Sequence, residues 1–126
     1  MHLSLASALL ASVLVAVPYC AQAQGKDAPA VECNLGPLTR TFGGTPWLVY
    51  SCSDGTSIVV VTKEENPAAP FYFFVFKREG KYVVFGEGTG AKSITDLAYN
   101  ELIKLKAEDI RSLIAASKRI SPALGK

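Results

Sequence analysis

The sequence contains few of the side chains that enzymes most often use for catalysis. It has one histidine, His2, and three cysteines among 126 residues. Because His2 falls in a predicted signal peptide (see below), we expect the exported protein to lack an imidazole. That would exclude Ser-His and Cys-His nucleophilic sites, zinc sites that contain histidine and acid–base catalysis by histidine. The sequence therefore predicts a protein that is not an enzyme and that uses no cofactor.

The acidic side chains show no pattern that would compensate for this lack. They fall in the predicted leader, in turns and on helix surfaces, where a solvated charge is the ordinary state. No two of them are set out as a pair for glycoside hydrolysis, and no segment has the alternating acidic spacing of a calcium loop. We therefore expect no metal site.

Length and charge balance exclude further classes of protein. A chain of 126 residues allows one domain only. It has 13 Lys and Arg against 11 Asp and Glu, a net charge of +2, and 19% charged residues. This is neither the basic excess of a nucleic-acid-binding protein nor the composition of a disordered acidic tail. We expect no nucleic-acid partner.

The N-terminal segment has the features of a signal peptide. Residues 1–23 contain no Lys, Arg, Asp or Glu, and the apolar run from Leu3 to Val17 is shorter than the ~20 residues that span a bilayer. Ala21 and Ala23 are small residues at the two positions that a signal peptidase reads. We predict a signal peptide over residues 1–23, a flexible leader over 24–30 and one domain over 31–126. The protein would then be periplasmic or extracellular, with no membrane span after cleavage.

Cleavage at this site would remove Cys20 and leave two cysteines, Cys33 and Cys52. Thiols pair in an oxidising compartment, so we expect a disulfide between them. Closing a loop of about 20 residues contributes on the order of 3 kcal/mol by restricting the unfolded chain. A reactive cysteine would need a CxxC spacing or a nearby histidine, and the sequence has neither.

The middle of the chain is typical of antiparallel strands. Asp54-Gly55 is a strong signal for a two-residue hairpin turn, and Glu79-Gly80 separates a second pair of aromatic and β-branched runs. The predicted strands are Leu38–Phe42 at one edge, Trp47–Cys52, Ser57–Thr62, Phe71–Arg78 and Lys81–Phe85. The sequence therefore predicts an antiparallel sheet of four to five strands built from two hairpins.

The C-terminal part changes to helical spacing. Apolar residues recur at Ile94, Ala98, Leu102 and Leu105, and Ser93 with Asp96 forms a capping-box pattern at the start of this helix. A second helix is predicted from Ala107, with Glu108 and Asp109 in its first turn, Lys118 and Arg119 in its last, and Pro122 preventing much continuation. Strands followed by helices indicate an α+β fold.

The glycine-rich segment Gly86–Ser93 resembles a phosphate-binding loop, but Ala91 stands where the Walker pattern needs its second glycine. Glycines here can simply turn the chain out of the sheet and into the helix. The alternative is an anion site formed by Gly88, Gly90, Lys92 and Ser93.

The second hairpin is unusual because both of its faces are apolar. A two-residue turn at Glu79-Gly80 pairs Phe74 with Phe85 and Phe76 with Val83, on the same face as Tyr72. Two explanations remain open. The sheet curls into a partial barrel, with residues 31–46 folding over it. Alternatively, either the face containing Tyr72, Phe74, Phe76 and Phe85 or the opposite face, which contains Phe71, Phe73, Val75, Tyr82 and Val84, stays uncovered until a protein partner or a second copy binds.

The segment YSCSDG at residues 50–55, followed by alternating valines, resembles the Tyr-x-Cys-x-x-Gly hairpin of periplasmic C-type lysozyme inhibitors. The resemblance covers a short part of the chain and implies a small exported β-barrel with a disulfide. The Ser-Gly-x-x-Tyr loop of those inhibitors is missing here, and their barrel leaves no place for two terminal helices. No functional residues are transferred from them.

These observations predict a small exported binding module. Its most concrete form is an inhibitor of, or an immunity protein against, an enzyme that attacks the cell envelope. One alternative is a structural or self-associating envelope protein. Another is a small enzyme or anion-binding domain that uses the Gly86–Ser93 loop.

Overall fold

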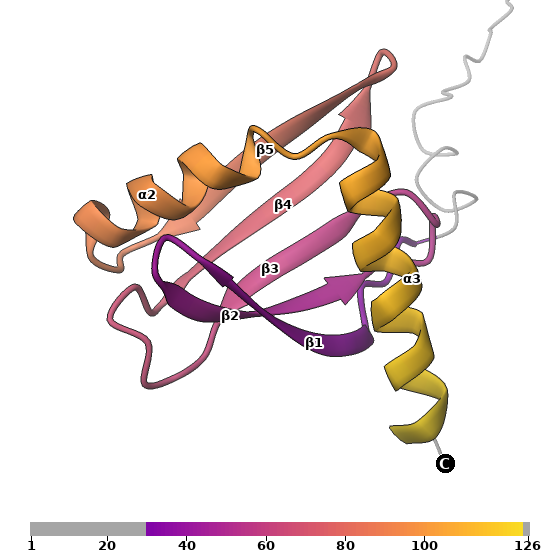
Figure 1. Ribbon diagram of the computed structural model, residues 1–126, viewed down its shortest axis with the longest axis horizontal. Coiled ribbons are helices and arrows are strands. Elements are labelled where there is room, and N and C mark those ends of the chain that lie inside the picture. Colours follow the sequence, from indigo (N-terminus) through magenta and orange to yellow (C-terminus); the bar gives the residue numbers. More distant parts are fainter. Residues whose placement is uncertain (1–29, 125–126) are drawn as a thin grey trace, which may run out of the picture. The chain divides into compact units, whose positions relative to one another are not determined.

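The computed structural model describes residues 30–124, and within them the chain forms one antiparallel sheet and two helices (Figure 1). The predicted signal peptide, with His2 and Cys20, and most of the predicted leader lie outside these residues. The strands are β1 (Leu35–Phe42), β2 (Thr45–Ser51), β3 (Ile58–Thr62), β4 (Phe71–Arg78) and β5 (Lys81–Gly88). The helices are α2 (Lys92–Leu102) and α3 (Ala107–Leu124). The α+β class and all five predicted strands are confirmed.

The strands follow one another across the sheet in the order β1-β2-β3-β4-β5, and each pairs antiparallel with the next. The sheet is not closed into a barrel, because β1 and β5 remain its two edges. Residues 31–46 were expected to fold over the sheet if it curled, but residues 35–42 of this segment instead form edge strand β1 beside β2. The barrel implied by the resemblance to lysozyme inhibitors is therefore also absent.

The two hairpins predicted from the sequence, β2–β3 (the first hairpin) and β4–β5 (the second hairpin), differ in their turns. Between β4 and β5, Arg78 pairs with Lys81, and the turn residues Glu79 and Gly80 have φ values of 54° and 80°. Positive φ at both positions is the pattern of a type I′ turn, and the predicted two-residue connection is confirmed. The first hairpin contradicts the expected two-residue turn, because six residues separate Ser51 from its partner Ile58.

Asp54 explains the longer turn of the first hairpin. Its carboxylate accepts hydrogen bonds from the N–H groups of Thr56 and Ser57, each at 2.9 Å, and from the Ser57 hydroxyl at 2.6 Å. Such a side chain organises a wider loop than a backbone turn does. Burial alone would raise the pKa of Asp54, but these hydrogen bonds together hold it below the usual value.

The disulfide between Cys33 and Cys52 is confirmed. It ties the segment before β1 to the residue that follows β2. Two hydrogen bonds reinforce the tie, since the Ser53 N–H donates to the Glu32 carbonyl at 2.7 Å and the Glu32 N–H donates to the Ser53 hydroxyl at 3.0 Å. The N-terminal end of the domain is thereby fixed to the first hairpin.

Helix α2 begins two residues earlier than its capping pattern predicts, since that pattern makes Ser93 the N-cap. Its N-cap is Ala91, and no side chain caps it. The Ser93–Asp96 capping box is therefore wrong. Asp96 instead accepts from the Lys92 ammonium at 3.1 Å, because residues four apart lie on the same side of a helix. Leu105, predicted as part of this helix, lies in the connection to α3.

Helix α3 begins at Ala107 as predicted, and Asp109 accepts from the Lys106 N–H at 2.8 Å. It continues past Pro122 to Leu124, so Lys118 and Arg119 do not form its last turn. A proline removes a hydrogen bond to the preceding turn, but the residues after it can still adopt helical angles. None of the described helices combines the length and the apolar character that crossing a membrane requires.

The core lies between the helices and one face of the sheet, which we call the inner face. In Figure 1 both helices lie on the near side of the sheet. Trp47 is fully buried and donates from Nε1 to the Phe42 carbonyl at 2.9 Å. Ser117 of α3 donates to the Ser51 hydroxyl at 2.8 Å. The buried apolar cluster consists of Leu38, Phe42, Trp47, Val49, Ile58, Val60, Ala68, Phe73, Val75, Ala98, Leu102, Ile110, Leu113 and Ile114.

Candidate functional site

The candidate site is the opposite face of the sheet, which we call the outer face. Strand residues alternate between the two faces, so the pairing register determines which residues share the outer face. The observed register pairs Phe74 with Phe85 and Phe76 with Val83, as predicted. The apolar residues of the outer face are Leu48, Tyr50, Val59, Val61, Tyr72, Phe74, Phe76, Val83 and Phe85.

No outer-face residue belongs to the core cluster, and none of the partly buried residues packed against that cluster comes from this face. Phe85 keeps 49% of its surface exposed and Tyr72 keeps 38%, while Phe74 and Phe76 are half-buried. The rings of Phe74 and Phe76 stack on each other, with their centroids 4.8 Å apart. Within residues 30–124, the four predicted binding residues thus form a continuous apolar surface outside the core.

One end of the outer face is basic. Arg78 and Lys81 form the last cross-strand pair before the hairpin turn, and both are exposed. The Arg78 guanidinium carbon lies 5.6 Å from the centroid of the Phe76 ring. A guanidinium over an aromatic face is stabilised by the ring quadrupole, and the alkyl stem of the arginine covers part of the ring. This end of the surface carries positive charge directly beside its aromatic residues.

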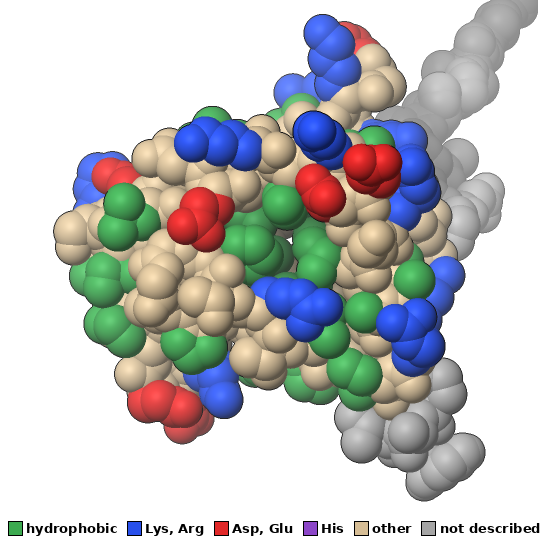
Figure 2. Space-filling view, viewed as in Figure 1, with side chains coloured by type: hydrophobic (Ala, Val, Ile, Leu, Met, Phe, Trp, Pro, Cys, Tyr) green, Lys and Arg blue, Asp and Glu red, His purple; other side chains and the backbone are tan. Residues whose placement is uncertain are grey.

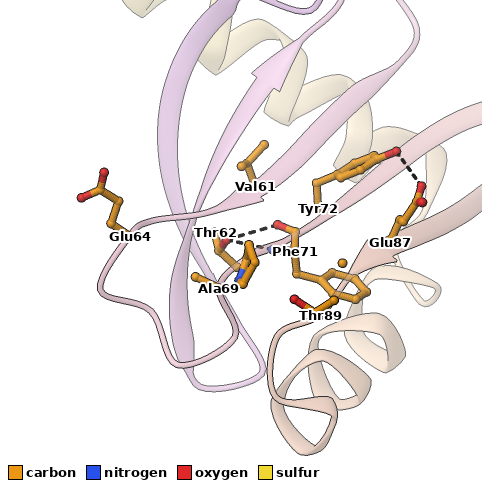
Figure 3. Close-up of a pocket in the computed structure, with 10 residues that line it drawn as sticks. Val61, Thr62, Glu64, Ala69, Phe71, Tyr72, Glu87 and Thr89 are labelled. Carbon is orange, nitrogen blue, oxygen red and sulfur yellow. Dashed lines mark hydrogen bonds between the residues drawn. The ribbon is translucent and has the colours of Figure 1, made fainter.

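A pocket of about 720 Å³ opens at the other end of the outer face (Figure 3). Its lining is mostly apolar and contains no lysine or arginine: it consists of Val61, Thr62, Glu64, Ala69, Pro70, Phe71, Tyr72, Glu87, Gly88 and Thr89. Figure 3 shows the Glu87 carboxylate turned toward the Tyr72 hydroxyl, whereas the Glu64 carboxylate points away. A pocket of this volume is large enough for a small ligand or for side chains of a partner.

One polar contact in this pocket joins the side chains of Tyr72 and Glu87. The Tyr72 hydroxyl donates to Oε1 of Glu87 at 3.3 Å. Desolvation and the negative charge of Glu87 raise the pKa of Tyr72 above its usual value, so the hydroxyl stays protonated and remains a donor. The site therefore offers a carboxylate and an aromatic face, a combination that favours a cationic group on the partner.

The glycine-rich segment is divided between strand and loop. Gly86 and Gly88 belong to β5, which extends three residues past its predicted end at Phe85. A Cβ on Gly86 would lie 2.8 Å from the Phe73 ring, and one on Gly88 would lie 2.6 Å from the Cα of Phe71. These glycines thus give room to the phenylalanines of β4.

Several polar groups of the predicted anion loop have partners within the chain. The N–H groups of Thr89 and Gly90 both donate to the Pro70 carbonyl, at 3.0 and 3.1 Å. The Lys92 ammonium pairs with Asp96, and Ser93 is an exposed residue in the first turn of α2. These contacts give the loop a structural role, and anion binding by Gly88, Gly90, Lys92 and Ser93 stays a prediction.

The helix side of the sheet is also hollowed, and Figure 2 shows a depression with a hydrophobic floor between α2 and α3. A pocket of about 270 Å³ beside α3 is lined by Arg40, Phe42, Leu105, Asp109, Ser112 and Leu113. A second, of about 530 Å³, lies between β5 and the helices and includes Val75, Leu102 and Ile110. Because these floors are core residues, we interpret both as incomplete closure of the core.

Sequence reasoning missed Glu87 and the pocket beside it. The signal for Glu87 was present, because the period of two that places Phe85 opposite Phe74 also places Glu87 opposite Tyr72. The glycines at 86 and 88 ended the predicted strand too early. The pocket wall from Ala69 and Pro70 depends on the path of the loop between β3 and β4, for which the sequence holds no periodic signal.

Among the residues that the structure describes, no group of three or more His, Cys, Asp or Glu side chains is placed to hold a metal ion.

Comparison with protein-family models, with curated proteins and with solved structures finds no match for this chain. The function is therefore argued from the site's own residues and geometry.

Proposed function

We propose that this protein is an exported, non-enzymatic binding module and that the outer face of its sheet is the surface that contacts a protein partner. One observation carries the proposal: a contiguous apolar sheet face, with Phe85 49% exposed, lies on the side of the sheet away from both helices. Half-exposed antiparallel sheets ordinarily alternate apolar with polar residues. A solvent-facing aromatic surface is a common mark of a protein interface.

The chemistry of the surface fits this use. Its centre is aromatic and its two ends are polar and charged, which is the usual arrangement of a binding patch with an apolar core and a polar rim. The disulfide supports a location in an oxidising compartment, periplasmic or extracellular. Inhibition of, or immunity to, an envelope-targeting enzyme is the most concrete form of this proposal.

A photoreactive phenylalanine analogue placed at Phe85 tests the proposal in cells that produce the protein. We expect light-dependent crosslinking at this position, because a partner on the outer face would contact the ring directly. The matched control is the same analogue at Leu97, which is 55% exposed but lies on α2. Absence of any crosslink at Phe85, or equal crosslinking from both positions, would contradict the proposed surface.

A further inference from the structure

Charge changes sign along the outer face of β4 and β5. Four cross-strand pairs form successive rows: Arg78 with Lys81, Phe76 with Val83, Phe74 with Phe85, and Tyr72 with Glu87. The first row is basic, the last contains a carboxylate, and the two between them are apolar. Rows two residues apart are separated by about 7 Å, so the charged ends are on the order of 20 Å apart. They cannot pair with each other within one chain.

A second copy of the chain satisfies both ends at once. A two-fold axis that lies between the two sheets, perpendicular to the strands and midway along the four rows, reverses the order of the rows in the second copy. The basic row of each copy then faces the Tyr72–Glu87 row of the other, and the two apolar rows face each other. Symmetric dimers use one self-complementary patch in this way. We propose that a second copy of this chain covers the outer face in this arrangement, which rests on the proposed function because it names the partner of that surface.

The pocket beside Tyr72 and Glu87 supports this occupant. Its lining contains no basic side chain, and Glu87 supplies a carboxylate next to the Tyr72 ring. In the dimer this pocket receives the hairpin tip that carries Arg78 and Lys81 from the other copy. Arg78 already lies over the Phe76 ring in its own chain, and it can pair with a carboxylate while keeping that stacked position.

The apolar rows supply the remaining part of the interface. Sheets that pack face to face interdigitate their side chains at about 10 Å separation, with strands within about 30° of each other. In such a packing Phe74 and Phe85 of one copy lie against Phe76 and Val83 of the other. Water is excluded from the centre, so the charged pairs at both ends of the interface are less screened than pairs on an open surface.

Sedimentation velocity of the protein, purified with its disulfide intact, tests the proposal. We expect a dimer that forms with rising concentration, from micromolar to near-millimolar, and that weakens in high salt. Arg78→Glu and Glu87→Arg should each weaken dimerisation at least tenfold, because each brings like charges together between positions 78 and 87 at both ends of the interface. An equimolar mixture of the two variants should recover the dimer, since positions 78 and 87 then bring one glutamate and one arginine together at each end of the mixed dimer.

Lys77→Glu is the matched control, because it makes the same charge change on the inner-face side of β4, one residue away from Arg78. It should leave dimerisation unchanged. A wild-type protein that stays monomeric at all concentrations, or a mixture no more dimeric than either variant alone, would overturn the second-copy arrangement. A monomer that still crosslinks from Phe85 to a different protein would overturn this inference while leaving the proposed function intact.

Discussion

Truncating two neighbouring phenylalanines of β4 should have very different effects on stability. Phe73 is 1% exposed, and the centroid of its ring lies 5.3 Å from the ring centroid of Trp47 and 5.0 Å from that of Phe71. Phe73→Ala removes these contacts and leaves a cavity in the core, which costs about 3 to 5 kcal/mol of unfolding free energy. At roughly 4 to 8 °C per kcal/mol for a domain of this size, the Tm should fall by at least about 12 °C.

Phe74→Ala is the matched comparison, since it removes the same side chain from the adjacent position on the outer face. Phe74 stays half-buried, with its ring stacked on that of Phe76, so its loss should cost only about 1 kcal/mol. This variant should nevertheless weaken association, because it removes the middle of the apolar surface.

Urea unfolding followed by tryptophan fluorescence measures both variants. Trp47 is the only tryptophan of the chain and is fully buried beside Phe73, so its emission reports directly on the core. Equal and large losses of stability for Phe73→Ala and Phe74→Ala, with association unchanged in both, would refute the reasoning, because Phe74 would then be a core residue.

Three further predictions concern the turns and the glycine loop. Gly88→Val should destabilise the protein by more than about 1 kcal/mol in urea unfolding, because Gly88 has a φ of 146° and its Cβ would meet Phe71; unchanged stability would contradict the described path of β5. Lys92→Ala should leave the free energy of unfolding within about 0.5 kcal/mol of the wild-type value, because its ion pair with Asp96 is exposed. If the loop binds anions, added phosphate should raise the Tm of the wild type; if it does not, the Tm should stay unchanged. The folded-state pKa of Asp54 lies below its unfolded value of 3.8, so its stabilising contribution is present above that pH and lost as pH falls through the folded pKa. Asp54→Asn should therefore flatten the dependence of Tm on pH below about pH 4. A variant whose Tm falls with decreasing pH as steeply as that of the wild type would contradict this role of Asp54.

Local signals predicted the β4–β5 hairpin accurately. The Glu79-Gly80 turn and the period of two determine which residues of β4 and β5 pair, and both are properties of neighbouring residues. The start of α3 at Ala107 was predictable for the same reason, because acidic residues in its first turn favour a helix start there.

Features that depend on distant contacts were not predictable in the same way. Whether the outer face is covered depends on where two helices and strand β1 pack, and the sequence left a partial barrel open as an explanation. The path through Gly88 to Gly90 depends on the Pro70 carbonyl, which accepts hydrogen bonds from two residues about 20 positions along the chain. The pocket beside Tyr72 requires that same approach of two loops, so periodicity along the chain could not reveal it.

The most direct test of the outer face as a binding surface is the sedimentation of fluorescently labelled protein in an envelope extract. We expect the wild type to sediment faster than a monomer, whether its partner is a second copy or another protein. Phe85→Ser should sediment as a monomer, because it removes the most exposed aromatic of the surface, whereas Leu97→Ser on α2 should sediment like the wild type. A Phe85→Ser variant that sediments like the wild type would contradict the proposal that the outer face is the binding surface.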